Sequence, residues 1–247
     1  MAYKLGEVLG DEVLLGKTRG GSVMALSMRD HQHRAIYFYG EYEPEITDLF
    51  QRLVTPGCTV FDVGANAGYF SLLSCECGAA HVHAFEPNPA VRSLLAQSSK
   101  LSSGDIEVVP AACSDHDGRT TLYVATPANT GKSSLKRKTE NSVEVDLITL
   151  DGYARDSGAR PDLIKVDVEG SEFEVLRGAR SLLETARPTV IAETKNPDVL
   201  DLMKSFGYTP NTIRLDGSTA VYEGQFGARH ENLCFLPDIN APEKAAA

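Results

Sequence analysis

Two short segments place acidic and glycine residues where a nucleoside ligand could bind. The first, TVFDVGANAG over residues 59–68, predicts a buried strand that carries Asp62 and leads into a turn containing Gly64 and Gly68. Glycine lets a ligand approach the backbone closely. The second, AFEPNP over residues 84–89, ends another predicted strand at Glu86. A carboxylate about 20 residues after such a turn is placed to accept hydrogen bonds from both hydroxyls of a ribose.

The turn favours S-adenosylmethionine over a nicotinamide cofactor. A nicotinamide-binding turn has the pattern Gly-x-Gly-x-x-Gly, and counted from Gly64 its third position is Asn66 and its sixth is Tyr69. A pyrophosphate needs the glycine at the second conserved position of that pattern. Asp62 also suits a cationic amino acid group better than a phosphate. We therefore expect Asp62 and the turn to face the methionine end and Glu86 to hold the ribose, with an NAD-dependent oxidoreductase as an alternative.

Charged residues at the ends of two later strands are candidates for the chemistry. Lys165, Asp167 and Glu169 alternate with apolar residues in the predicted strand PDLIKVDVEG, and Glu193 ends the next one. Charges on a buried strand are costly unless they reach the carboxyl end of the sheet, where open α/β sheets bind ligands. We expect a carboxylate there to act as general base or to orient the acceptor, with Lys165 keeping it ionised. These carboxylates could hold Mg²⁺, but direct displacement requires no metal, and we predict no metal site.

Two further segments are expected to contact ligands. The third predicted strand, residues 106–109, ends in small residues that leave room for an adenine ring, with Ser114 or Asp115 as partner of its amino group. The polar loop over residues 126–141 is long for a compact domain, and such loops often contribute to binding sites. Within it, Asn129, Lys132 and Ser133 are the candidate substrate-binding residues.

The elements that position these residues alternate between strands and helices. The order β-α-β-α-β followed by a late antiparallel region predicts a doubly wound α/β sheet. Turn-rich breaks before it predict a small antiparallel β meander that includes a strand over residues 35–39. One helix is expected over residues 171–183. We divide the chain into an N-terminal β-rich extension (1–38), the main domain (39–236) and a flexible tail (237–247).

Composition agrees with a soluble enzyme. The chain has 247 residues and a net charge of −10, and its basic residues do not cluster, so we expect no nucleic-acid partner. No apolar run approaches the roughly 20 residues of a membrane helix, and we expect no membrane association. The five cysteines form no Cys-x-x-Cys pair, which favours reduced thiols and a cytoplasmic location.

Taken together, the motifs resemble the FkbM-type S-adenosylmethionine-dependent methyltransferases. The likeness rests on YGEYEPE, DVGANAGYFS, HAFEPNP, the AACSDHDG region, IKVDVEGSE and IAE, in this order. It implies the class I methyltransferase (Rossmann-like) fold with a seven-stranded, mostly parallel sheet. It also implies methyl transfer, usually to a hydroxyl of a sugar, polyketide or other secondary metabolite. Methylation of nitrogen or a carboxylate, and a non-catalytic binding module, are the alternatives. We expect a small-molecule acceptor and a monomer or homodimer.

The likeness also suggests roles for individual residues. Asp167, Glu169, Lys165 and Glu193 are the expected catalytic residues, and Tyr39, Glu41 and Glu169 join the loop residues as expected acceptor contacts. The residues expected to contact the cofactor are Glu41, Asp62, Gly64, Ala65, Asn66, Gly68, Tyr69, Phe70, Glu86, Pro87, Ala112, Ser114, Asp115 and Asp167.

Overall fold

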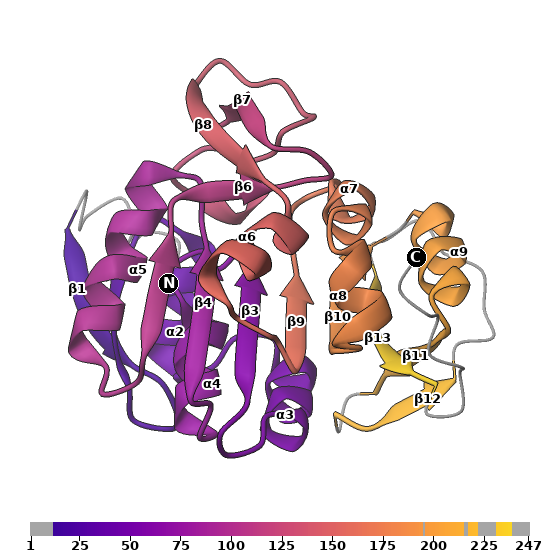
Figure 1. The fold of residues 1–247 in the computed structure, drawn as a ribbon. Coiled ribbons are helices and arrows are strands. Elements are labelled where there is room, and N and C mark those ends of the chain that lie inside the picture. The colour runs from indigo at the N-terminus through magenta and orange to yellow at the C-terminus, as the bar shows by residue number, and fades with distance from the viewer. Residues whose placement is uncertain (1–11, 195, 215–216, 222–230, 239–247) are drawn as a thin grey trace.

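The computed structural model describes residues 12–194, 196–214, 217–221 and 231–238, and its centre is one twisted β-sheet (Figure 1). The strand order is β12-β11-β13-β10-β9-β3-β4-β5. Five neighbouring strands are parallel: β5 (Ile106–Val109), β4 (His81–Phe85), β3 (Thr59–Val63), β9 (Leu163–Val166) and β10 (Thr189–Thr194). Three are antiparallel: β13 (Glu231–Pro237), β11 (Tyr208–Ile213) and the short edge strand β12 (Thr219–Val221). The predicted seven-stranded, mostly parallel sheet is thus confirmed, with β12 added at its edge.

Helices cover both faces of the sheet because successive strand residues point to opposite sides. Phe61 and Val63 of β3 join one core cluster, whereas Val60 joins the other. The first cluster packs α6 (Leu150–Ser157), α7 (Glu172–Arg177), α8 (Arg180–Thr185) and α9 (Pro197–Ser205) against the sheet. The second packs α3 (Pro44–Leu53), α4 (Tyr69–Glu76) and α5 (Pro89–Leu101). This is the doubly wound arrangement that the sequence predicts.

The prediction of an N-terminal β meander is only partly correct. A hairpin forms from β1 (Val13–Lys17) and β2 (Val23–Ser27), but the predicted strand over residues 35–39 is part of a helix, α2 (His31–Tyr39). The buried Asp30 carboxylate caps this helix by accepting hydrogen bonds from the backbone N–H groups of Gln32 and His33. Asparagine and aspartate favour the N-cap position for this reason, which outweighed the strand propensity of residues 35–39. Residues 1–11 lie outside the described part of the chain.

The prediction of a single helix over residues 171–183 is also wrong, because this segment forms two separate helices, α7 and α8. At the break, a Cβ on Gly178 would lie 1.9 Å from the backbone oxygen of Ser114, so only glycine allows this close approach. The Asp151 carboxylate then accepts hydrogen bonds from the N–H groups of Ser181 and Leu182, at 2.8 and 2.9 Å. These bonds satisfy the free donors of a new helix start.

A small second sheet stands above the carboxyl ends of β3, β4 and β9 (Figure 1). Its order is β6-β8-β7, formed by β6 (Ala111–Cys113), β7 (Gly118–Tyr123) and β8 (Ser142–Ile148). The polar loop between β7 and β8 contains a 3₁₀ turn, η1 (Thr130–Lys132). This sheet therefore holds the loop over the end of the main sheet where ligands are expected.

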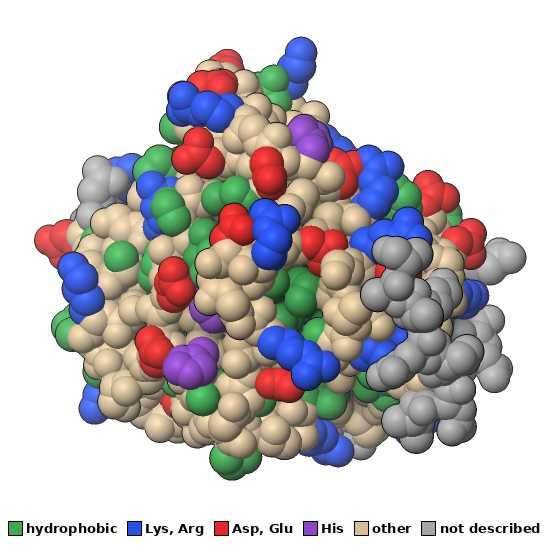
Figure 2. Space-filling view, viewed as in Figure 1, with side chains coloured by type: hydrophobic (Ala, Val, Ile, Leu, Met, Phe, Trp, Pro, Cys, Tyr) green, Lys and Arg blue, Asp and Glu red, His purple; other side chains and the backbone are tan. Residues whose placement is uncertain are grey.

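The surface in Figure 2 mixes charges of both signs. Lys and Arg side chains are interspersed with Asp and Glu on this face and form no single basic patch. No helix in the described ranges is long and apolar enough to cross a bilayer. Of the predicted tail, residues 239–247 are outside the described ranges.

Candidate active site

The glycine-bearing turn after β3 is tied to both neighbouring strands. The N–H groups of Gly64 and Ala65 donate to the Phe85 carbonyl at the end of β4, each at 3.0 Å. Gly64 has φ of 85°, and a Cβ there would lie 1.9 Å from the backbone oxygen of Asp167, which follows β9. Only glycine fits both the positive φ and this close contact. The turn is therefore held at the carboxyl ends of three adjacent parallel strands.

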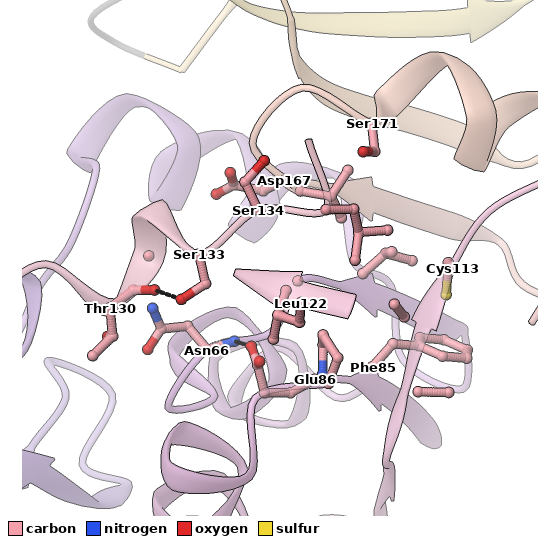
Figure 3. A pocket seen from close by; sticks show the side chains of 18 residues that line it. Asn66, Phe85, Glu86, Cys113, Leu122, Thr130, Ser133, Ser134, Asp167 and Ser171 are labelled. Carbon is pink, nitrogen blue, oxygen red and sulfur yellow. Dashed lines mark hydrogen bonds between the residues drawn. The ribbon is translucent and has the colours of Figure 1, made fainter. Parts of the chain in front are cut away.

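Glu86 lies beside this turn and lines the cavity in Figure 3. One carboxylate oxygen accepts from the Asn66 N–H at 2.9 Å and the other from the Asn88 N–H at 2.8 Å. Each oxygen retains a lone pair for a further donor. The side chain is buried, and burial raises its pKa to about 7 in spite of the two backbone donors. The cavity wall thus offers a carboxylate that can accept two more hydrogen bonds.

We call the cavity of Figure 3 the first cavity. It is lined by Val63, Gly64, Asn66, Phe85, Glu86, Pro87, Ala111, Ala112, Cys113, Leu122, Thr130, Gly131, Ser133, Ser134, Leu135, Asp167, Val168 and Ser171. Ala112 and Pro87 lie where the sequence predicts. Ser171 was not predicted, and its buried hydroxyl has no hydrogen-bond partner among the described residues.

Ser114 and Asp115, the predicted adenine contacts, do not line this cavity. The Ser114 N–H donates to the Ile148 carbonyl, and Asp115 forms an ion pair with Arg177. Because β6 belongs to the small sheet, the chain turns away from the cavity after Cys113. The small side chains of Ala112 and Cys113 form the wall instead.

Asp62 is buried beneath the turn and lines neither cavity. One of its oxygens accepts from the Ser71 hydroxyl at 2.6 Å, and the other has no hydrogen-bond partner among the described residues. Burial raises the pKa of this carboxyl, and the nearby Lys165 counteracts the rise. The contact of Asp62 with the methionine end of the cofactor stays a prediction.

A second cavity adjoins the first. It is lined by His31, Gln32, His33, Ile36, Tyr42, Glu43, Gly64, Ala65, Asn66, Ala67, Tyr69, Phe70, Asn129, Gly131, Lys132, Lys165, Asp167, Glu169 and Glu193. Four residues line both cavities, namely Gly64, Asn66, Gly131 and Asp167. The structure thus brings the turn, the strand-end charges and the polar loop together around one junction.

The four predicted catalytic residues all line the second cavity. Lys165 is buried and forms an ion pair with Asp167 at 2.9 Å. Burial alone would lower the pKa of Lys165, but the carboxylates of Asp167 and its neighbours outweigh burial and raise it. Burial, assisted by Asp167 and Glu43, raises the pKa of Glu193 to about 8. A carboxyl with that pKa gains and loses its proton near neutral pH.

Glu41 and Tyr39, the predicted ligand contacts before the turn, line neither of these two cavities. Glu41 pairs with Arg19 at 2.8 Å, and Tyr39 is 77% exposed at the end of α2. Glu43 takes the position expected of Glu41. Gly68 also lines neither cavity, but it begins α4 with φ of 94°, a value that favours glycine.

The polar loop is fastened to α2. The second oxygen of Asp30 accepts from the backbone N–H and the hydroxyl of Thr130, at 2.6 and 2.7 Å. The Ser134 hydroxyl donates to the Glu169 carbonyl at 3.0 Å on the other side. The loop residues predicted to bind substrate line the two cavities: Asn129 and Lys132 line the second, and Ser133 lines the first.

Comparison with known proteins identifies the family. The model of the methyltransferase FkbM domain matches residues 62–210, more than half of the chain. The chain belongs to the FkbM methyltransferase family. It is 30% identical over 147 residues to the hexuronic acid methyltransferase AglP of Haloferax volcanii, covering 59% of each protein. It is 29% identical over 191 residues to the 31-O-demethyl-FK506 methyltransferase FkbM of Streptomyces tacrolimicus, covering 62% of this chain and 74% of that one.

Solved structures show the same fold. Methyltransferase FkbM from Methylobacillus flagellatus superposes with a TM-score of 0.50 at 18% identity, over 83% of this chain and 54% of that one. A methyltransferase from Agrobacterium tumefaciens gives 0.50 at 10% identity, over 93% and 71%. The chain spans about three fifths of the Haloferax relative.

The family match begins at Asp62, after several residues that build the second cavity. These preceding residues are His31, Gln32, His33, Ile36, Tyr42 and Glu43. They were not predicted, although Asp30 as an N-cap and Gly40 as a C-cap could have revealed α2. Among the described residues, no three His, Cys, Asp or Glu side chains are grouped so that they could hold a metal ion.

Proposed function

We propose that this FkbM-family protein is an S-adenosylmethionine-dependent methyltransferase that methylates a hydroxyl of a small molecule. The observation that carries the proposal is the junction of the two cavities at Gly64, Asn66 and Asp167. In the first cavity lies Glu86, whose carboxylate can accept hydrogen bonds from a ribose. In the second cavity lie ionisable carboxyls. A methyl donor and a hydroxyl acceptor would meet at that junction.

The first cavity fits the nucleoside part of the cofactor. In this proposal Glu86 accepts hydrogen bonds from both ribose hydroxyls, and the adenine lies against Ala112 and Cys113. Gly64 lets the ligand lie against bare backbone, since a side chain there would already collide with Asp167. The partnerless Ser171 hydroxyl supplies a further polar contact. The bound cofactor supplies a methyl group that is already activated on sulfur.

The protein then has to hold the acceptor in line and remove its proton. Glu193 is the proposed general base, because a pKa of about 8 lies close to the operating range of a base at neutral pH. Its carboxylate would take the proton of the acceptor hydroxyl, and the cofactor, when bound, would supply the methyl group to that oxygen. Lys165 holds Asp167 in place by an ion pair, so that Asp167 orients the acceptor, and Glu169 borders the same space.

A polar, hydroxyl-rich acceptor suits the second cavity, which combines carboxyl, amide and aromatic side chains. The names of the two relatives describe methylation of a hexuronic acid and of 31-O-demethyl-FK506. We extend this class, a sugar or polyketide hydroxyl, to the present chain, which would act as a monomer or homodimer. Methylation of nitrogen or a carboxylate is the alternative.

Calorimetric titration with S-adenosylhomocysteine and with NAD tests the cofactor. Micromolar binding of the first and none of the second is expected. Purified protein would next be incubated with S-adenosylmethionine carrying a labelled methyl group and with uronic acids or hydroxylated macrolides, and products separated by chromatography. Absence of S-adenosylhomocysteine binding would remove the methyltransferase proposal, and label on nitrogen or a carboxyl group would replace the acceptor class.

A further inference from the structure

The amino acid end of the proposed cofactor needs a partner for its ammonium group. The sequence assigns this role to Asp62, but Asp62 lies beneath the turn and lines neither cavity. Asp167 is already engaged by Lys165 at 2.9 Å. A ligand whose ribose binds Glu86 would extend past Gly64 and Asn66, which line both cavities, and its amino acid end would enter the second one.

Glu43 is one of the carboxylates that line this second cavity. It lines the space together with the turn residues Gly64, Ala65, Asn66 and Ala67. Its Oε2 atom is buried and has no hydrogen-bond partner among the described residues. A buried carboxylate oxygen without a partner costs folding free energy. A ligand group that donates a hydrogen bond there would remove this cost.

The backbone holds Glu43 in an unusual conformation. Its φ is 45°, in the left-handed region that residues other than glycine rarely adopt. The conformation is stabilised because the Glu43 carbonyl accepts from the N–H groups of Ile46 and Thr47, at 3.0 and 2.9 Å, at the start of α3. Strain of this kind persists where the surrounding structure enforces it and is typical of functional sites. Here it accompanies the entry of Glu43, rather than Glu41, into the cavity.

We propose that Glu43 binds the ammonium group of the cofactor's amino acid end, an inference that rests on the proposed function. An ammonium donates up to three hydrogen bonds, and the free Oε2 accepts one of them. The aromatic residues Tyr42, Tyr69 and Phe70 also line this space. Glu43 precedes the family-matched residues, so this contact lies outside the region that the family model covers.

The ionisation of Glu43 gives the proposal a second readout. Burial raises its pKa to about 7, with Lys165 opposing the rise. A bound ammonium favours the carboxylate, so binding at pH 7 releases about 0.5 proton from this group. Glu86 also releases protons when ribose hydroxyls bind it. Methylthioadenosine contains the ribose but lacks the amino acid, so the difference between the two ligands reports on the carboxyls of the second cavity, Glu43 and Glu193.

The experiment is calorimetric titration of the whole chain with S-adenosylhomocysteine and with methylthioadenosine, in buffers of different ionisation enthalpy. For Glu43→Gln, S-adenosylhomocysteine affinity should fall about 10- to 100-fold while methylthioadenosine affinity stays the same. In the unmodified protein, S-adenosylhomocysteine should release more protons than methylthioadenosine at pH 7, and Glu43→Gln should reduce this difference by about 0.5 proton. The matched control is Glu45→Gln. Glu45 lies two residues after Glu43, in the first turn of α3, and lines neither cavity.

Other outcomes separate the two proposals. Equal affinities of the variant and the unmodified protein for S-adenosylhomocysteine would overturn the role of Glu43 while leaving the methyltransferase proposal intact. An equal loss for both ligands would also overturn it, because the substitution would then have damaged the nucleoside site. Failure of the unmodified protein to bind either ligand would overturn the proposed function and this inference with it.

Discussion

Burial of the Glu86 carboxyl lowers the unfolding free energy of the protein once this group is ionised, and replacing it with glutamine should reveal that cost. Its pKa is raised from 4.5 to about 7 in the folded protein because it is buried. Below pH 4.5 the carboxyl is neutral in both the folded and the unfolded chain, and no cost arises. As pH rises from 4.5 to about 7, Glu86 ionises in the unfolded chain but stays largely protonated in the folded one. The folded state therefore loses stability relative to the unfolded chain over this range.

The magnitude follows from the size of the pKa shift. One pKa unit corresponds to 1.36 kcal/mol, so a rise from 4.5 to about 7 costs at most about 3 kcal/mol at high pH. Between pH 5 and pH 8.5 the growth of this cost is about 2.5 kcal/mol. Glutamine cannot ionise, so Glu86→Gln should remove that part of the pH dependence. Its absolute stability also reflects the loss of one acceptor for a backbone N–H, and the pH slope is therefore the cleaner quantity.

Urea denaturation at a series of pH values, without ligand, measures the effect. The unfolding free energy of the unmodified protein should fall more steeply from pH 5 to pH 8.5 than that of Glu86→Gln, by about 2.5 kcal/mol over the range. The exposed Glu140→Gln should retain the full slope. Glu86→Gln should also bind S-adenosylhomocysteine about 10- to 100-fold more weakly. Equal slopes for all three proteins would refute the assignment of a buried, readily protonated carboxyl to Glu86.

Three other substitutions probe the base, the turn and the loop. The methyl-transfer rate should rise with pH through about 8 as Glu193 ionises, and Glu193→Gln should lower kcat about 100-fold and remove that titration, as pH–rate profiles would show. Gly64→Ala should lower the unfolding free energy by about 2 to 4 kcal/mol in urea denaturation, because its Cβ would meet the Asp167 oxygen. Asp30→Asn can still cap α2, but it presents an amide to Thr130 and disturbs both hydrogen bonds to that residue, whereas Thr130→Val loses only the hydroxyl bond. Trypsin should therefore cleave the loop at Lys132 faster in Asp30→Asn than in Thr130→Val. An unchanged kcat of Glu193→Gln would contradict the first prediction, and an unchanged unfolding free energy of Gly64→Ala the second. Equal cleavage of Asp30→Asn and Thr130→Val would contradict the third.

The sequence predicts the parts of the site that depend on neighbouring parallel strands. The turn after β3, Glu86 after β4 and Asp167 after β9 each follow a short apolar run, and the carboxyl ends of parallel strands meet at one edge. The order of the motifs is therefore sufficient to bring these residues together. The same logic places Glu193 near the carboxyl end of β10.

Contacts set by single backbone angles or by distant loops could not be predicted. Glu41, Glu43 and Glu45 lie within five residues, and no sequence pattern shows that Glu43, whose φ is positive, is the one that lines the cavity. The bond from Asp30 to Thr130 joins positions 100 residues apart, and no local pattern connects an N-cap with a loop across the chain. The prediction of one helix over residues 171–183 failed for a similar reason, because the Asp151 carboxylate that starts α8 comes from another helix.

The distribution of the site along the chain bears on what distinguishes this protein from its relatives. The first cavity is built from residues 63–171, all inside the family-matched range, whereas α2 and Glu43 precede it. If the first cavity holds the cofactor, its residues serve a ligand common to every methyltransferase that uses it. The two relatives are named for different acceptors, a hexuronic acid and 31-O-demethyl-FK506. It follows from the proposed function that acceptor choice depends on the second cavity, and that α2 and the loop fastened to it by Asp30 are the elements to exchange between relatives in order to change it.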